Sequence, residues 1–151
     1  MARGSLTITS PDFEADGPIP RRYAVEGGNT VPSLTIGGVP TAAVELAVIC
    51  HDPDAPRPRG FTHWVVYGLA PGQTTVRDVG HGIGRQGPNS LGERSYTGPN
   101  PPIGHGIHRY YFWVYALARS VRGEPTREAF LDDYADAILE QNRLVGTYRR
   151  G

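Results

Sequence analysis

The chain has 151 residues, and its 15 arginines and 15 acidic residues give a formal net charge of zero when histidine is neutral. This balance argues against a general nucleic-acid-binding protein, whose affinity comes mainly from an excess of positive charge. No apolar run approaches the ~20 residues that cross a bilayer, so we expect no membrane span and a cytoplasmic location. The single cysteine, Cys50, excludes an internal disulfide, and the length suits one domain over residues 1–151.

The predicted elements are mostly strands, because 20 glycines and 14 prolines disfavour a bundle of long helices. Residues 5–9 predict a first strand. Residues 43–51 are nearly all apolar and rich in β-branched types, which indicates a central strand buried on both faces. Residues 60–69 and 108–118 are dense in aromatic and β-branched residues and predict two further core strands.

The long segment between the last two strands, residues 79–106, holds eight glycines and four prolines. A loop of that length inside a compact domain is usually functional or disordered. Aromatic and polar residues punctuate it, which favours a functional loop.

Only the region near the C-terminus has a helical pattern. Thr126 is a candidate N-cap, and Phe130, Tyr134 and Ile138 form an apolar stripe at intervals of four residues. We expect Gly146 to end this helix and the next two residues to return to the sheet.

Chemically active side chains gather in three places: the run from Asp52 to Pro56, His63 with its neighbour Trp64, and the loop from Tyr96 to Tyr110. If the strands that carry them are neighbours in one sheet, these groups meet at one rim. We therefore expect the side chains of Asp52, His63 and His108 in one shared cavity. The alternative is that the aspartates only form Asx turns and that the histidines are structural.

Several kinds of enzyme are disfavoured by the same residues. Asp52, Asp54, His63 and His108 are suitable metal ligands, but the sequence lacks the paired histidines of a zinc-protease helix, and we expect no metal or other cofactor. There is no Gly-x-Ser-x-Gly elbow and no phosphate-binding Gly-Lys-Ser/Thr loop. Cys50 and His51 are adjacent, and adjacent strand residues point to opposite faces. We expect no catalytic residue and no enzymatic activity.

Two motifs resemble the signatures of the phosphatidylethanolamine-binding protein family. They are Asp52-Pro-Asp-Ala-Pro56 followed by His63-Trp64, and the run from Gly98 through three prolines to His108-Arg-Tyr110. The length and the end of the chain are similar to the bacterial and archaeal branch, often called Raf kinase inhibitor-like. The resemblance implies a mainly β fold, with a large antiparallel sheet packed on a smaller sheet and short C-terminal helices.

The resemblance also implies a small anion pocket for phosphate groups of phospholipid head groups or other phospho-ligands. It further implies a partner protein that the chain modulates and a homodimeric assembly. The pocket would be lined by Asp52, Asp54, Ala55, Pro56, His63, Asn100, Pro101, His108 and Tyr110. The alternatives are an inhibitor of a kinase or serine protease that acts by surface contact, and a hydrolase that uses the Asp/His cluster. If the aspartates raise the pKa of the pocket histidines, phosphate binds better as the pH falls from about 8 to 6.

Overall fold

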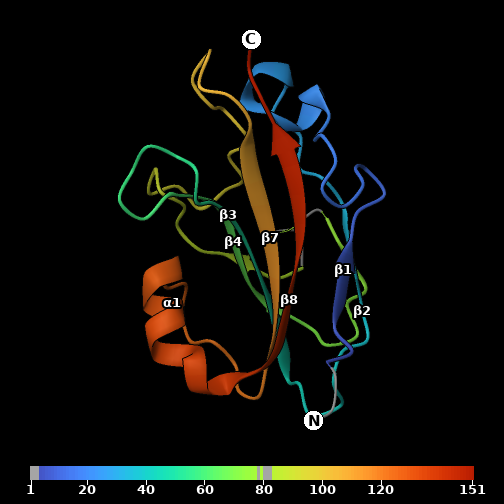
Figure 1. Cartoon of the computed structure of the whole chain (residues 1–151). Coiled ribbons are helices and arrows are strands. Elements are labelled where there is room, and N and C mark those ends of the chain that lie inside the picture. The colour runs from blue at the N-terminus through green and yellow to red at the C-terminus, as the bar shows by residue number, and fades with distance from the viewer. Residues whose placement is uncertain (1–3, 78, 80–82) are drawn as a thin grey trace.

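The computed structural model describes residues 4–77, 79 and 83–151, and two antiparallel sheets dominate this part of the chain (Figure 1). The larger sheet has the strand order β6-β4-β3-β7-β8, and the smaller has the order β1-β2-β5. The larger sheet consists of β6 (Arg85–Gln86), β4 (Phe61–Leu69), β3 (Glu45–Asp52), β7 (His108–Leu117) and β8 (Ile138–Tyr148). The smaller consists of β1 (Thr7–Thr9), β2 (Leu34–Gly37) and β5 (Thr75–Val76).

The helical elements are short. The described residues contain one α-helix, α1 (Arg127–Tyr134), and 3-10 turns at η1 (Arg21–Tyr23), η2 (Val25–Gly27) and η3 (Ala135–Ala137). In Figure 1, β1 and β2 lie on one side of the larger sheet and α1 lies on the other. The predicted mainly β fold, with a large sheet packed on a smaller one, is confirmed.

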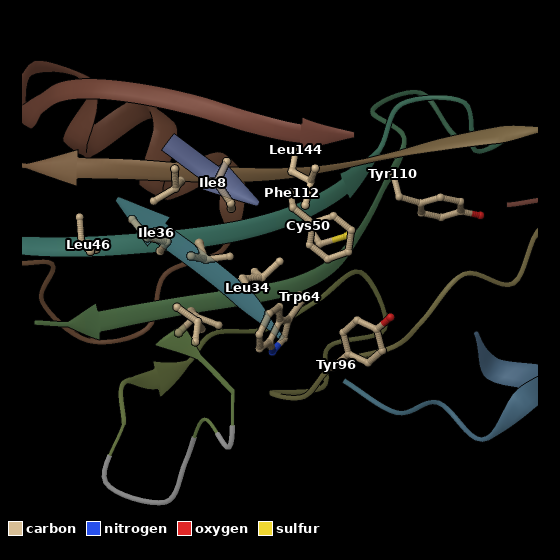
Figure 2. Close-up of a cluster of buried hydrophobic side chains, with 14 of the residues drawn as sticks. Ile8, Leu34, Ile36, Leu46, Cys50, Trp64, Tyr96, Tyr110, Phe112 and Leu144 are labelled. Carbon is tan, nitrogen blue, oxygen red and sulfur yellow. The ribbon is translucent and has the colours of Figure 1, made fainter. Parts of the chain in front are cut away.

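The main core fills the space between the two sheets, where alternate residues of facing strands meet (Figure 2). The smaller sheet contributes Ile8, Leu34 and Ile36, and the larger contributes a set that includes Leu46, Cys50, Trp64, Phe112 and Leu144. Every residue of β3 is buried, as its apolar sequence predicts, because the smaller sheet covers one face and α1 covers part of the other.

The second core lies under α1. The Thr126 side chain caps the helix by accepting a hydrogen bond from the Ala129 amide at 3.2 Å. Phe130 is fully buried, with its ring centroid 5.4 Å from that of Tyr67 and 5.3 Å from that of Tyr115. The predicted N-cap and the first half of the apolar stripe are therefore correct.

The predicted end of this helix is wrong. The helix stops at Tyr134, and β8, from Ile138 to Tyr148, pairs with β7 along its whole length. Pairing with β7 outweighs the helical spacing of the apolar residues, so the chain continues as a strand after Tyr134. Gly146 does not end a helix but lies opposite Tyr110, where an added Cβ would be 2.6 Å from the side chain of Ile19.

The long loop is held against the rest of the protein by hydrogen bonds. Beyond β6, the Thr97 amide donates to the carbonyl of His63 at 3.0 Å, and the Gly98 amide donates to Asn29 Oδ1 at 2.6 Å. At Gly98 a Cβ would lie 2.1 Å from the carbonyl oxygen of Tyr23, so only glycine fits there. These contacts bring residues 97–102 to the beginning of β4; residues 80–82 of the predicted loop lie outside the described residues.

Candidate ligand-binding site

A cavity of about 300 Å³ opens at the rim of the larger sheet, where β3 ends and β4 and β7 begin. Of the predicted site residues, Asp52, Ala55, Pro56, His63, Asn100, Pro101, His108 and Tyr110 line this cavity. The structure therefore brings Asp52, His63 and His108 together in one cavity. Thr97, Gly98 and Pro102 of the predicted loop also line the wall, and Arg57, Phe61 and Leu91, which were not among the predicted site residues, complete it.

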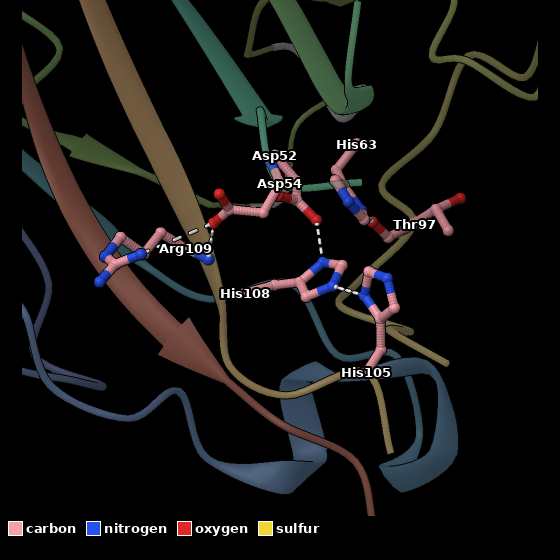
Figure 3. A network of polar contacts seen from close by, with 7 residues as sticks. All are labelled: Asp52, Asp54, His63, Thr97, His105, His108 and Arg109. Carbon is pink, nitrogen blue, oxygen red and sulfur yellow. Dashed lines mark hydrogen bonds and ion pairs between the residues drawn. The ribbon is translucent and has the colours of Figure 1, made fainter. Parts of the chain in front are cut away.

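Asp52 organises the polar side of the cavity (Figure 3). Its carboxylate is buried and accepts two hydrogen bonds, from the backbone amide of Asp54 at 2.7 Å and from Nδ1 of His108 at 2.7 Å. The first is the local turn contact expected of an aspartate before proline. Asp52 thus forms the turn of its own loop and also fixes the ring of His108. The Asx-turn role and the role as a cavity residue, which the sequence left as alternatives, are therefore both fulfilled.

Asp54 does not line the cavity. Its carboxylate accepts a hydrogen bond from the backbone amide of Arg109 at 2.9 Å and lies 4.0 Å from the guanidinium of the same residue. This contact ties the loop after β3 to the first residues of β7. Asp54 therefore supports the position of the loop rather than facing a ligand.

His63 is neutral and presents a lone pair to the cavity. Its Nδ1 lies 2.6 Å from the carbonyl oxygen of Thr97, and because a carbonyl can only accept, the ring proton is on Nδ1. Burial lowers the pKa of His63 to about 4, although the Asp52 carboxylate acts in the opposite direction. For this histidine the condition stated for stronger binding in acid is not met, because desolvation outweighs the attraction of the carboxylate.

His108 takes part in a chain of three side chains. On one side its Nδ1 donates to Asp52, and on the other its Nε2 lies 2.5 Å from Nδ1 of His105 (Figure 3). His108 is buried, whereas His105 is exposed. The exposed ring of His105 therefore covers the ring nitrogen of His108 that would otherwise be free to meet a ligand.

Tyr110 and Arg57 are the hydrogen-bond donors of the cavity wall that are best suited to bind an anion. Burial raises the pKa of Tyr110, so its hydroxyl keeps its proton, and Figure 2 shows that hydroxyl pointing away from the other labelled core side chains. Arg57 is exposed at the cavity mouth, and its guanidinium carbon lies 5.0 Å from the centroid of the Phe61 ring. Arg57 directly follows Pro56, the last residue of the Asp-Pro-Asp-Ala-Pro motif. Its place next to this motif is the signal in the sequence that could have identified it as a site residue.

Cys50 and His51 do not form a nucleophile–base pair. Cys50 is buried in the main core, where burial raises the pKa of its thiol, while His51 lies on the other face of β3 and bonds through Nδ1 to Thr62 Oγ1 at 3.0 Å. Within residues 4–77, 79 and 83–151, no group of three or more histidine, cysteine or acidic side chains is placed to hold a metal ion.

Comparisons with known proteins agree with this architecture. The crystal structure of a phosphatidylethanolamine-binding protein homologue, CT736 from Chlamydia trachomatis, matches with a TM-score of 0.89 and 35% identity, covering 99% of this chain and 100% of that one. Escherichia coli YbcL, described as a member of the mammalian PEBP family, matches with a TM-score of 0.88 and 27% identity, covering 97% and 99% of the two chains.

Sequence relatives extend across bacteria and archaea. A UPF0098 protein from Methanothermobacter thermautotrophicus is 40% identical over 154 residues, which span 97% of this chain and all of the relative. A relative from Mycobacterium tuberculosis is named as a candidate lipoprotein, LppC. It is 39% identical over 150 residues, which span 95% of this chain and 72% of the relative. That name leaves the expected cytoplasmic location a prediction.

A membrane-crossing helix is absent from the described part of the chain, where none is both long and apolar enough. The family model for phosphatidylethanolamine-binding proteins matches residues 9–149, nearly the whole sequence. Together with the relatives and the shared fold, this match shows that the chain belongs to the phosphatidylethanolamine-binding protein family.

Proposed function

We propose that the protein is a non-enzymatic binding module whose cavity holds the phosphate group of a small phospho-ligand or of a phospholipid head group. The observation that carries this proposal is the combination of Arg57 and the protonated Tyr110 hydroxyl around a cavity of about 300 Å³. Charged and hydroxyl donors of this kind form the strong hydrogen bonds to phosphate oxygens. The volume suits a phosphate with a short substituent, at the low end of the usual range for small-molecule sites.

The walls of the cavity favour binding over chemistry. Pro56, Pro101 and Pro102 restrict the backbone of the two loops that form the mouth, so little conformational entropy is lost when a ligand orders them. Thr97 brings a hydroxyl, but its Oγ1 lies 3.2 Å from the amide nitrogen of Asn89, which donates to it. The cavity therefore offers fixed positions for a ligand, which supports the binding role that we propose.

The direct test is calorimetric titration of the protein with phosphoethanolamine at pH 6. Arg57→Gln removes the cation at the mouth and should weaken binding about tenfold or more, because a hydrogen bond to a charged group is worth roughly 1.5–3 kcal/mol. Arg59→Gln is the matched control, since Arg59 is also exposed but lines a different cavity beside α1. No binding, or equal losses in both variants, would contradict the proposal. Vesicles containing phosphatidylethanolamine, compared with soluble phosphoethanolamine, distinguish a lipid head group from a free ligand.

We also propose that the protein is a homodimer. Tyr111 and Trp113 are half-buried on the face of the larger sheet that carries α1, with ring centroids 6.4 Å apart. The Arg143 guanidinium lies over both rings, 5.6 Å and 5.4 Å from their centroids, and the parts of the rings that stay exposed are the surface that a second copy would cover. Light scattering should give about twice the chain mass of 16.4 kDa. A mass equal to one chain at micromolar concentration would contradict this assembly.

A further inference from the structure

We propose that the cavity selects a phosphate group that carries a proton, bound as a monoanion that donates its P–O–H to Nε2 of His63. This inference rests on the proposed phosphate-binding function and specifies the protonation state of the ligand. It also predicts that isosteric anions without a proton are rejected.

The orientation of the His63 ring is fixed from both sides. The Thr97 amide donates to the backbone carbonyl of His63 at 3.0 Å, while Nδ1 of His63 donates to the carbonyl of Thr97 at 2.6 Å. The ring also packs between Phe61 and Tyr110, with centroid distances of 4.6 Å and 5.2 Å. Turning the ring to offer its N–H to a ligand would break the bond to Thr97 and this packing, so the free nitrogen stays an acceptor.

The charged groups around His63 do not change this assignment. His51 lies on the other face of β3, and only its charge acts on His63, whose pKa it lowers. The titratable side chains that face His63 come from β3, from the loop after β3 and from β7: Asp52, Arg57, His108 and Tyr110. Asp52 is the anion among them, and both of its oxygens already accept hydrogen bonds, from Asp54 and His108. Burial keeps the pKa of His63 at about 4, so the ring gains no proton of its own at neutral pH.

The consequence for an anion is specific. A dianionic phosphate or a sulfate ester places an oxygen lone pair against the lone pair of Nε2 and leaves a buried acceptor unpaired, which is costly. A phosphate monoanion instead donates its proton to Nε2 and keeps two oxygens for Tyr110 and Arg57. Sites built around a ligand hydroxyl discriminate strongly against analogues that lack it.

The test compares ethyl phosphate with ethyl sulfate by calorimetry on the full chain. The two anions have similar shapes and the same single charge at pH 5.5, but only the phosphate ester has a proton to donate, since its second pKa is ~6. We expect ethyl phosphate to bind at least about tenfold more tightly at pH 5.5, the ratio for one lost hydrogen bond. Toward pH 8 its affinity should fall about tenfold per pH unit, with uptake of a proton on binding, while ethyl sulfate is unaffected.

A second pair of measurements uses matched histidine variants. His63→Gln places an amide that can donate to the ligand, and it should bring the ratio of the phosphate and sulfate affinities close to one. His51→Gln, on the opposite face of β3, should leave the ratio unchanged. The ligand comparison on the unmodified chain stands even if a variant fails to fold.

The remaining outcomes separate this inference from the proposed function. Equal affinities for ethyl phosphate and ethyl sulfate at pH 5.5 would overturn the inference and leave phosphate binding intact. Tighter binding of ethylammonium than of ethyl phosphate would also overturn it, because the donor to Nε2 would then be a cation. Binding of neither anion would refute the proposed function itself.

Discussion

The neutral, buried His63 makes the stability of the protein sensitive to mild acid. The folded protein holds this ring with a pKa of about 4, whereas a histidine in the unfolded chain has a pKa of ~6.5. Between these values the unfolded state binds more protons than the folded state, so stability is lost as the pH falls through this window. From pH 8 to pH 5, with a slope that approaches about 1.4 kcal/mol for each pH unit between the two pKa values, His63 alone removes about 2 kcal/mol from the free energy of unfolding.

The assay is urea unfolding followed by tryptophan fluorescence at pH 8 and pH 5, for the unmodified chain and for His63→Asn. The asparagine amide can still donate to the carbonyl of Thr97, but it does not titrate. Because the variant also loses ring packing, the informative quantity is the difference in unfolding free energy between the two pH values. That difference should be about 2 kcal/mol smaller in His63→Asn. An identical pH dependence in both proteins would refute the conclusion that His63 is held neutral.

Three substitutions test other contacts of the site and fold. His108→Ala leaves the buried Asp52 carboxylate without its ring partner and should destabilise the protein by about 1.5–3 kcal/mol in urea unfolding, whereas His108→Asn, which keeps a donor, should cost clearly less. Gly98→Ala places a Cβ against the carbonyl of Tyr23 and should lower the thermal midpoint by several degrees; an unchanged midpoint would mean that the loop can shift. Thr126→Ala removes the cap of α1 and should cost about 1 kcal/mol, with no effect on titration by a phosphate ligand.

The long strands could be predicted from the sequence because their residues are buried by their immediate neighbours in the sheet. The predicted segments 43–51, 60–69 and 108–118 correspond to β3, β4 and β7 within two residues at each end. The short strands of the smaller sheet, apart from β1, and the edge strand β8 were not found. Strands of two to four residues are too short for a periodic pattern, and β8 gains its structure from pairing with β7 rather than from its own composition.

Most of the site could be predicted because two motifs provide most of its wall. The geometry of the site could not be predicted, because the contacts that decide the chemistry of its side chains join segments far apart in the sequence. Thr97, which fixes the tautomer of His63, lies 34 residues further along the chain. The burial that lowers the pKa of His63 likewise arises only when the loop packs over the beginning of β4. Charge patterns in the sequence therefore suggested a protonated histidine where packing produces a neutral one.

The contacts of β8 with residues 5–19 have a consequence for how the protein folds while it is synthesised. The Ser5 amide donates to the Glu140 carboxylate at 2.7 Å, Asn142 donates to the carbonyl of Leu6 at 2.9 Å, and the Ile19 amide donates to the carbonyl of Thr147 at 2.7 Å. These contacts of residues 5, 6 and 19 cannot form until β8 has been synthesised, although β1 can already pair with β2. Until β8 is present, its buried side chains Leu144 and Tyr148 are missing from the main core, so the partly synthesised chain exposes apolar surface that chaperones can recognise.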